Sequence, residues 1–335
     1  MLRFGIRMDV LITGGAGFIG GHIAEQLAGN GNDVTVIDNF VPYYDCGIKR
    51  HNVETCREAA ERGGGRYELV EASITSEAVV DELIADCDVV YHQAAQAGVR
   101  KSVDEPALVN EYNVTGTINV LESARRHNPD RVVFASSSSV YGKPEYLPYD
   151  EAHPTTPVSP YGTSKLAGEQ YARVYTEIYG LPTVSLRYFT VYGPRMRPNM
   201  AMTNFVSRCL HGEPPVVYGS GEQTRDFTYV DDIRRVNEQL LTVARADGEI
   251  LNLGSTDNID VQTLAETIRD EIDPQLDIVY DDRRKGDAEH THADVSKANE
   301  LLDYEPTVDI RSGVRMFINW YRENEAWYDP LVRNS

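Results

Sequence analysis

The chain has 335 residues, enough for one large or two modest domains around a substantial buried core. Its 52 Asp and Glu residues outnumber 32 Lys and Arg, so the formal net charge is -20 and we expect neither nucleic acid nor a membrane as a partner. The acidic residues are spread along the chain, which predicts a solvated acidic surface and suggests, as a hypothesis, an adaptation to high salt.

The first glycines of the chain predict a dinucleotide site. The apolar run DVLIT, residues 9–13, predicts a buried parallel strand that leads directly into GGAGFIG. Gly14 and Gly17 allow a tight turn close to a pyrophosphate. Gly20 allows the following helix, 18–28, to pack on the strand with its N-terminus aimed at the phosphates.

A second strand, expected at 34–37, ends at Asp38. A carboxylate at this point accepts the hydroxyls of the adenosine ribose. It would also repel the 2′-phosphate of NADP, so the sequence predicts NAD as the cofactor.

Apolar runs keep alternating with helical stretches beyond this point. Strands are expected at 89–95, 131–137 and 183–189, with helices at 109–126 and after residue 160. This alternation predicts an α/β fold with a doubly wound parallel sheet of the Rossmann type, followed by a smaller C-terminal α/β substrate lobe. The expected divisions are 8–189 plus about 229–259 for the NAD-binding domain, and about 190–228 and 260–335 for the lobe.

The segment 160–179 predicts a helix. Ser159 can cap its start, its first residue is a proline, and Gly180 can end it. Tyr161 and Lys165 are four residues apart, so they share one face near the start of this helix.

These two residues form a candidate catalytic group with the serines that follow the strand at 131–137. A phenol with an ordinary pKa of about 10 is a poor base, but the positive charge of Lys165 favours the phenolate. Tyr161 would take the proton of a sugar hydroxyl while hydride leaves the carbon for NAD. Ser137 would hydrogen-bond the same oxygen and stabilise the developing carbonyl.

The four cysteines favour a reduced, cytoplasmic protein. Cys46, Cys56, Cys87 and Cys209 form no CxxC pair and no secreted-type disulfide framework. The eight histidines are scattered, and we expect no metal site. The N-terminal stretch MLRFGIR lacks the apolar core of a signal peptide, and Met8 is an alternative start.

Six stretches carry a family resemblance. They are TGGAGFIG, HQAAQAGVR, SSSSVYG, PYGTSK, RYFTVYGPRMRP and RDFTYVDDI. Together they resemble the extended short-chain dehydrogenase/reductase family, and within it the NAD-dependent nucleotide-sugar epimerases of UDP-glucose and UDP-glucuronate. The resemblance runs from about residue 8 to about residue 321.

The resemblance implies a role for each matching residue. Ser137, Tyr161 and Lys165 match the shared catalytic residues, and Asn113 matches an asparagine that positions the active-site helix. The implied cofactor contacts are Gly14, Gly17, Phe18, Ile19, Asp38, Asn39, Ala94, Asn113, Tyr161, Lys165 and Tyr188. The implied UDP-sugar contacts are Ser138, Ser139, Thr190, Arg197, Phe205, Gln223, Arg225, Arg284 and Asp287, the last three for the diphosphate and ribose.

The family's reactions differ in the residues beside the catalytic serine. Ser138 and Ser139 stand where sugar dehydratases carry an acidic pair, so 4-epimerisation through a transient 4-keto sugar is favoured. The stretch FTVYGPRMRP is more similar to UDP-glucuronate 4-epimerases than to typical UDP-glucose 4-epimerases, which have Asn in place of Thr190. Arg195 or Arg197 could bind a C6 carboxylate, but both the hexose and the hexuronate reading stay open.

Other readings also stay open. The chain could be another epimerase, dehydratase or one-way reductase of the same family, or a catalytically silent NAD-binding module. The resemblance further implies a homodimer, in which the helices at 109–126 and 160–179 pair with those of a second copy.

Overall fold

The computed structural model describes residues 7–255, 257–282 and 289–335. Its centre is a seven-stranded sheet in the order β10-β6-β5-β4-β1-β2-β3, with every neighbouring pair parallel. The strands are β1 Asp9–Thr13, β2 Asp33–Asp38, β3 Arg66–Glu71, β4 Val89–His92, β5 Arg131–Ser137, β6 Thr183–Tyr188 and β10 Ile250–Leu253. The strand order reverses beside β1, as in the doubly wound fold that the sequence predicts.

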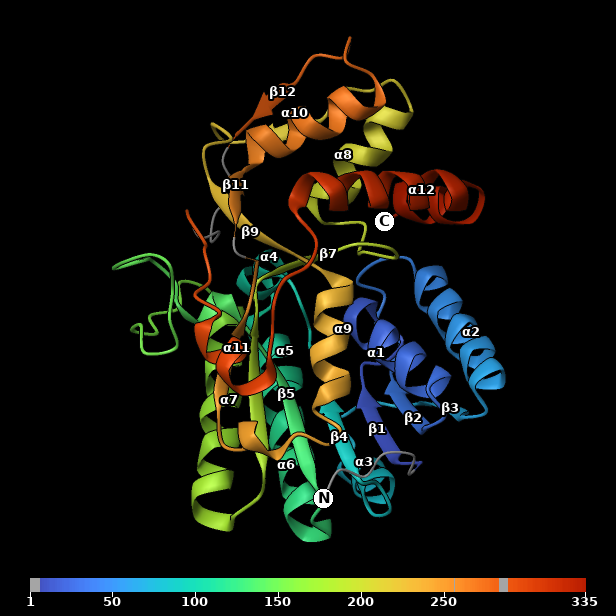
Figure 1. The fold of residues 1–335 in the computed structure, drawn as a ribbon, viewed down its shortest axis with the longest axis vertical. Coiled ribbons are helices and arrows are strands. Elements are labelled where there is room, and N and C mark those ends of the chain that lie inside the picture. Colours follow the sequence, from blue (N-terminus) through green and yellow to red (C-terminus); the bar gives the residue numbers. More distant parts are fainter. Residues whose placement is uncertain (1–6, 256, 283–288) are drawn as a thin grey trace.

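Two groups of helices flank this sheet (Figure 1). One group packs around α1, which contacts both α2 and α9, and the other packs around α6, which contacts α3 and α7. The first group is α1 Phe18–Gly29, α2 Cys46–Gly63 and α9 Val230–Gln239, and the second is α3 Glu77–Ile84, α6 Gly116–His127 and α7 Pro160–Tyr179. The α7 bounds are those the sequence predicts, because Ser159 caps the helix and Gly180 ends it in the left-handed conformation.

The helix expected at 109–126 is present, but a π-helical turn interrupts its regular repeat. The chain forms α4 Val99–Asp104, α5 Pro106–Asn110, a π-helical turn at Glu111–Thr115 and then α6. A π-helical turn adds a residue to the helical repeat and often marks a functional site. Here it contains Asn113.

A second lobe lies beyond the carboxyl ends of the sheet strands, at the top of Figure 1. It contains one three-stranded and one two-stranded sheet, covered by helices. Its elements are β7 Thr190–Tyr192, α8 Ala201–Leu210, β8 Val216–Tyr218, β9 Thr224–Tyr229, β11 Asn258–Asp260, α10 Val261–Ile272, β12 Val279–Asp281 and α12 Ile310–Arg333. α11 Ser296–Leu302 instead packs against β10 of the central sheet.

One hydrophobic core continues from the sheet into the lobe. It includes Ile12 and Val36 in the sheet, and Leu264 and Phe317 in the helices of the lobe. Burial of this apolar surface holds the two parts together and fixes the lobe over the ends of the strands.

Candidate active site

The carboxyl ends of the central strands bring several predicted site residues together. β2, β5 and β6 end at Asp38, Ser137 and Tyr188, and β1 leads directly into Gly14. Because the strands are parallel, these ends lie along one edge of the sheet, where α/β proteins bind their ligands.

The glycine turn packs tightly against neighbouring backbone at the start of α1. Gly14 has φ +69°, and a Cβ there would lie 2.7 Å from the Cα of Ala94. A Cβ on Gly20 would lie 2.5 Å from the carbonyl oxygen of Gly14. Gly17 caps α1 without a side-chain bond, so the first N–H groups of the helix, including those of Phe18 and Ile19, remain free to bind phosphate oxygens.

Asp38 has a buried partner that the sequence analysis missed. The Lys49 ammonium and the backbone N–H of Phe40 both bind Asp38 Oδ1, at 3.1 and 2.9 Å. Oδ2 makes no hydrogen bond within the described residues, so it can still accept from a ribose. The signal for Lys49 was its place among the apolar residues of α2, where Ile48 and Val53 are buried.

The remaining cofactor candidates differ in exposure. Asn39 is exposed, with its side chain accepting from the N–H of Val41 at 3.4 Å. Tyr188 is buried, and its hydroxyl accepts from the side chains of Asn237 and Gln93.

Asn113 ties the loop after β4 to helix α7. Its amide group accepts from the N–H of Gln96 at 2.7 Å and donates to the carbonyl of Gln96 and to the hydroxyl of Ser164. Ser164 directly precedes Lys165, so this bond fixes the π-helical turn against the start of α7.

Tyr161 and Ser137 lie together at the start of α7. Ser137 is extended, its Oγ accepts from the N–H of Ser139 at 3.2 Å, and its side chain hydrogen-bonds Tyr161. Gly162 permits this approach, because a Cβ there would lie 2.4 Å from the Ser139 carbonyl oxygen. Ser138 and Ser139 occupy the short 3-10 turn that follows β5.

A second cation, Arg197, acts on Tyr161. Burial raises the pKa of Tyr161, while Arg197 lowers it more than any other charge and the Ser137 hydrogen bond lowers it further. Lys165 is buried, donates to the carbonyl of Ala135 at 2.7 Å, and has its pKa lowered by burial to about 7. Arg197 is therefore a cation that favours the Tyr161 phenolate, in addition to the role expected of Lys165.

Arg197 lies in the loop that follows β7 and is half-buried. Its Nη2 contacts the Met200 sulfur at 3.5 Å, and its guanidinium lies 5.8 Å from the centre of the Tyr43 ring. Its buried Nη1 has no hydrogen-bond partner among the described residues. Thr190 opens the same strand, and Tyr43, which the sequence analysis missed, comes from the loop after β2.

Arg195 points elsewhere. It is buried, hydrogen-bonded to His22 of α1 and paired with Glu25. Only one of the two arginines in this loop is therefore near Tyr161.

The other predicted UDP-sugar contacts belong to the lobe. Phe205 is buried in α8, and the Gln223 amide donates to the Tyr218 carbonyl at 2.9 Å. Arg225 donates to the carbonyls of Thr224 and Glu289, at 2.8 and 3.3 Å. The predicted contacts Arg284 and Asp287 lie outside the described residues.

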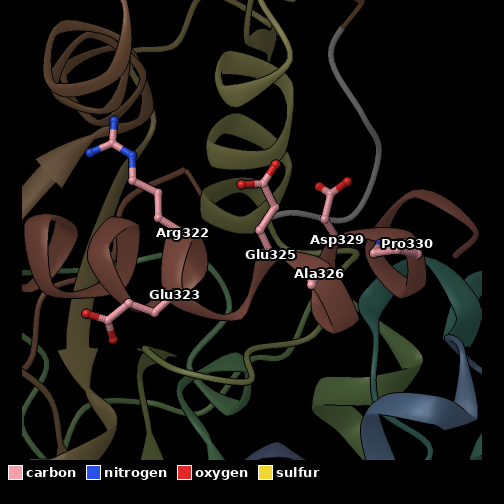
Figure 2. Close-up of a pocket in the computed structure, with 6 residues that line it drawn as sticks. All are labelled: Arg322, Glu323, Glu325, Ala326, Asp329 and Pro330. Atoms are coloured by element: carbon pink, nitrogen blue, oxygen red, sulfur yellow. The ribbon is translucent and has the colours of Figure 1, made fainter.

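A separate hollow of about 500 Å³ opens on α12 (Figure 2). Figure 2 shows its charged side chains spread apart, with Arg322 and Glu323 pointing in different directions. None of its lining residues is a predicted site residue. We therefore place the candidate active site at the strand ends.

Among residues 7–255, 257–282 and 289–335, no helix is long and apolar enough to cross a membrane. In the same residues, no group of three or more His, Cys, Asp or Glu side chains is placed to hold a metal ion.

Comparison with known proteins identifies the family. Residues 11–317 match the GDP-mannose 4,6 dehydratase family. A putative UDP-glucose 4-epimerase of Methanocaldococcus jannaschii is 38% identical, covering 94% of this chain and 99% of its own. UDP-glucuronate 4-epimerase 4 of Arabidopsis thaliana is 37% identical over 94% of this chain and 75% of its own.

Solved structures agree with these relatives. The UDP-glucuronic acid 4-epimerase of Bacillus cereus, in complex with UDP-glucuronic acid and NAD, superposes with a TM-score of 0.88. It is 34% identical and covers 94% of this chain and 99% of its own. The chain therefore belongs to the extended short-chain dehydrogenase/reductase family, among its NAD-dependent nucleotide-sugar epimerases.

Proposed function

We propose that this protein is a UDP-sugar 4-epimerase that interconverts UDP-glucuronate and UDP-galacturonate. The observation that carries the choice of substrate is Arg197, whose charge lowers the pKa of Tyr161 more than any other while its guanidinium forms no ion pair with a described carboxylate. A sugar whose C4 hydroxyl meets Tyr161 has its C6 group close by. A carboxylate there would pair with the Arg197 guanidinium through a charge-assisted bond.

The residues at the strand ends fit NAD. The glycine turn has no room for side chains, and Asp38 Oδ2 can accept from the ribose. When bound, NAD accepts the C4 hydrogen with its electron pair and later returns it. The residues proposed to hold it are Gly14, Gly17, Phe18, Ile19, Asp38, Asn39, Ala94, Asn113, Tyr161, Lys165 and Tyr188, within the NAD-binding domain expected at 8–189 and about 229–259.

The chain's own groups handle the proton. Tyr161 takes the proton from the C4 hydroxyl as the C4–H bond breaks, which leaves a ketone. Ser137 donates to the ketone oxygen, and Lys165 holds the start of α7 against β5 through Ala135. The 4-keto sugar then rotates in the site and presents its opposite face. Tyr161 returns the proton to the C4 oxygen, and the opposite C4 configuration results.

The proposed sugar contacts are Ser138, Ser139, Thr190 and Arg197. Phe205, Gln223 and Arg225 would bind the nucleotide from the lobe, together with Arg284 and Asp287. An enzyme of net charge -20 needs such local cations to bind a diphosphate.

A direct test incubates the purified protein with UDP-glucose and with UDP-glucuronate in parallel, without added cofactor, and reads the C4 configuration by proton NMR. We expect UDP-galacturonate. Formation of UDP-galactose alone would instead support a hexose epimerase, the reading favoured by the Methanocaldococcus relative. Conversion of neither sugar, even with added NAD, would contradict both.

Replacing Arg197 tests the substrate assignment. We expect Arg197→Met to raise KM for UDP-glucuronate by at least about tenfold, because the carboxylate loses its charged partner, while KM for UDP-glucose changes less than about threefold. Steady-state kinetics with both sugars measures this. An equal change in KM for both sugars would show that Arg197 does not recognise the C6 group.

We also propose a cytoplasmic homodimer. The described cysteines are all free, as expected of a reducing compartment. α7 exposes Tyr171 and Ile178, seven residues apart and so on one face, at 39% and 66%. Paired copies of this helix would cover both side chains.

Light scattering tests the dimer. We expect the native protein to run as a dimer and Ile178→Asp as a monomer, because a buried unpaired carboxylate opposes association. Met316→Asp changes an exposed apolar residue on α12 and should remain dimeric. A monomeric native protein would contradict the proposal.

A further inference from the structure

The loop that carries Arg197 is held on both sides by buried contacts. On one side, Arg195 reaches α1, where it pairs with Glu25 and hydrogen-bonds His22. On the other, the Tyr328 hydroxyl of α12 donates to the carbonyl of Met196. Residues 195 and 196 are thus fixed directly before Arg197.

The contacts of His22 define its protonation. Its Nε2 lies 2.8 Å from the Pro194 carbonyl, which can only accept, so Nε2 carries the proton. Its Nδ1 lies 2.8 Å from Arg195 Nη2, which can only donate, so Nδ1 is the acceptor. His22 is neutral, and its pKa is held well below the ordinary value by burial and by the Arg195 charge.

Arg195 also adopts an uncommon backbone conformation. Its φ is +61°, which a non-glycine residue seldom adopts without support from its surroundings. The side chain is buried against α1, so the contacts with His22 and Glu25 stabilise this turn of the loop. α1 is the same helix that begins at the glycine turn.

We infer that Arg195, together with His22 and Glu25, is a positioning group that sets the place of Arg197 and so determines selectivity for the C6 group of the sugar. This inference rests on the proposed function. Arg195 acts indirectly, by holding the loop that carries Arg197. Helix α1, which follows the glycine turn, thereby contributes to recognition of the sugar.

Kinetics of Arg195→Met with both sugars test this inference. We expect KM for UDP-glucuronate to rise about tenfold, with kcat and the KM for UDP-glucose changed less than about threefold. In the Arg197→Met background, Arg195→Met should change selectivity no further, because its effect passes through Arg197. Glu25→Gln, at a half-buried side chain, should shift selectivity in the same direction if Arg195→Met does not fold.

Arg131→Met is the matched control. Arg131 is similarly buried and, like Arg195, binds a carboxylate, that of Asp247; its second partner is the carbonyl of Leu240, and it lies at the opposite end of β5 from Ser137. Arg131→Met should lower the free energy of unfolding without changing the ratio of the KM values for the two sugars.

The possible failures are distinguishable. If the native protein does not convert UDP-glucuronate, the proposed substrate is wrong. If Arg197→Met leaves selectivity intact, Arg197 does not recognise the C6 group, and the positioning role of Arg195 fails with it. If Arg197→Met removes selectivity but Arg195→Met and Glu25→Gln change both sugars equally, or add to the effect of Arg197→Met, only the positioning role is overturned.

Discussion

Tyr161→Phe should lower kcat by about 10²- to 10⁴-fold, the range for loss of a general acid–base group. The variant keeps the aromatic ring at the start of α7 but cannot take the proton from the C4 hydroxyl. KM for the UDP-sugar should change little, since Arg197 and the lobe residues remain. The measurement is the initial rate of epimerisation at saturating sugar.

Tyr192→Phe is the control for this experiment. Its hydroxyl is also buried but has no hydrogen-bond partner among the described residues, so its removal should leave kcat almost unchanged. A Tyr161→Phe protein with native kcat would show that another group moves the proton. An inactive native protein would instead favour the silent NAD-binding reading.

Arg187→Met should destabilise the protein by about 3–5 kcal/mol, because it leaves a buried carboxylate without its cation. Arg187 and Glu169 are joined by two hydrogen bonds of 2.6 and 2.9 Å, and their side chains are 3% and 0% exposed. Glu169 also accepts from Ser136, the neighbour of Ser137, at 2.9 Å. Urea unfolding followed by tryptophan fluorescence gives the free energy.

The double variant Arg187→Met/Glu169→Met separates the two possible causes. Removing both charges should recover most of the lost stability, since two apolar side chains can replace a buried ion pair at little cost. Equal destabilisation in the single and double variants would mean that packing, and not the unpaired charge, dominates. A loss below about 1 kcal/mol for Arg187→Met would contradict the argument outright.

Local signals in the sequence determined the main elements of the central domain. β1, β5 and α7 have the bounds expected from short apolar runs, a capping serine, a proline at the first helical position and a terminal glycine. Strand alternation was enough to predict the parallel sheet. It also predicted that Asp38 and Ser137 lie along one edge, because parallel strands end together.

Tertiary contacts decided the details of the site. Lys49 and Tyr43 looked like ordinary helix and loop residues, and only packing brought them to Asp38 and Arg197. Asn113, in the π-helical turn, likewise bonds to Gln96 in the loop after β4 and to Ser164 on α7. Both contacts depend on the tertiary structure.

The two arginines of the β7 loop show most clearly where the sequence is insufficient. Arg195 and Arg197 are the same residue type two positions apart, and either suits a carboxylate. The sequence determined that two cations follow the strand that contains Thr190. Which arginine faces Tyr161 was decided by the positive φ of Arg195 and by its partners on α1, since side-chain direction in an irregular loop follows from the surfaces that pack against it.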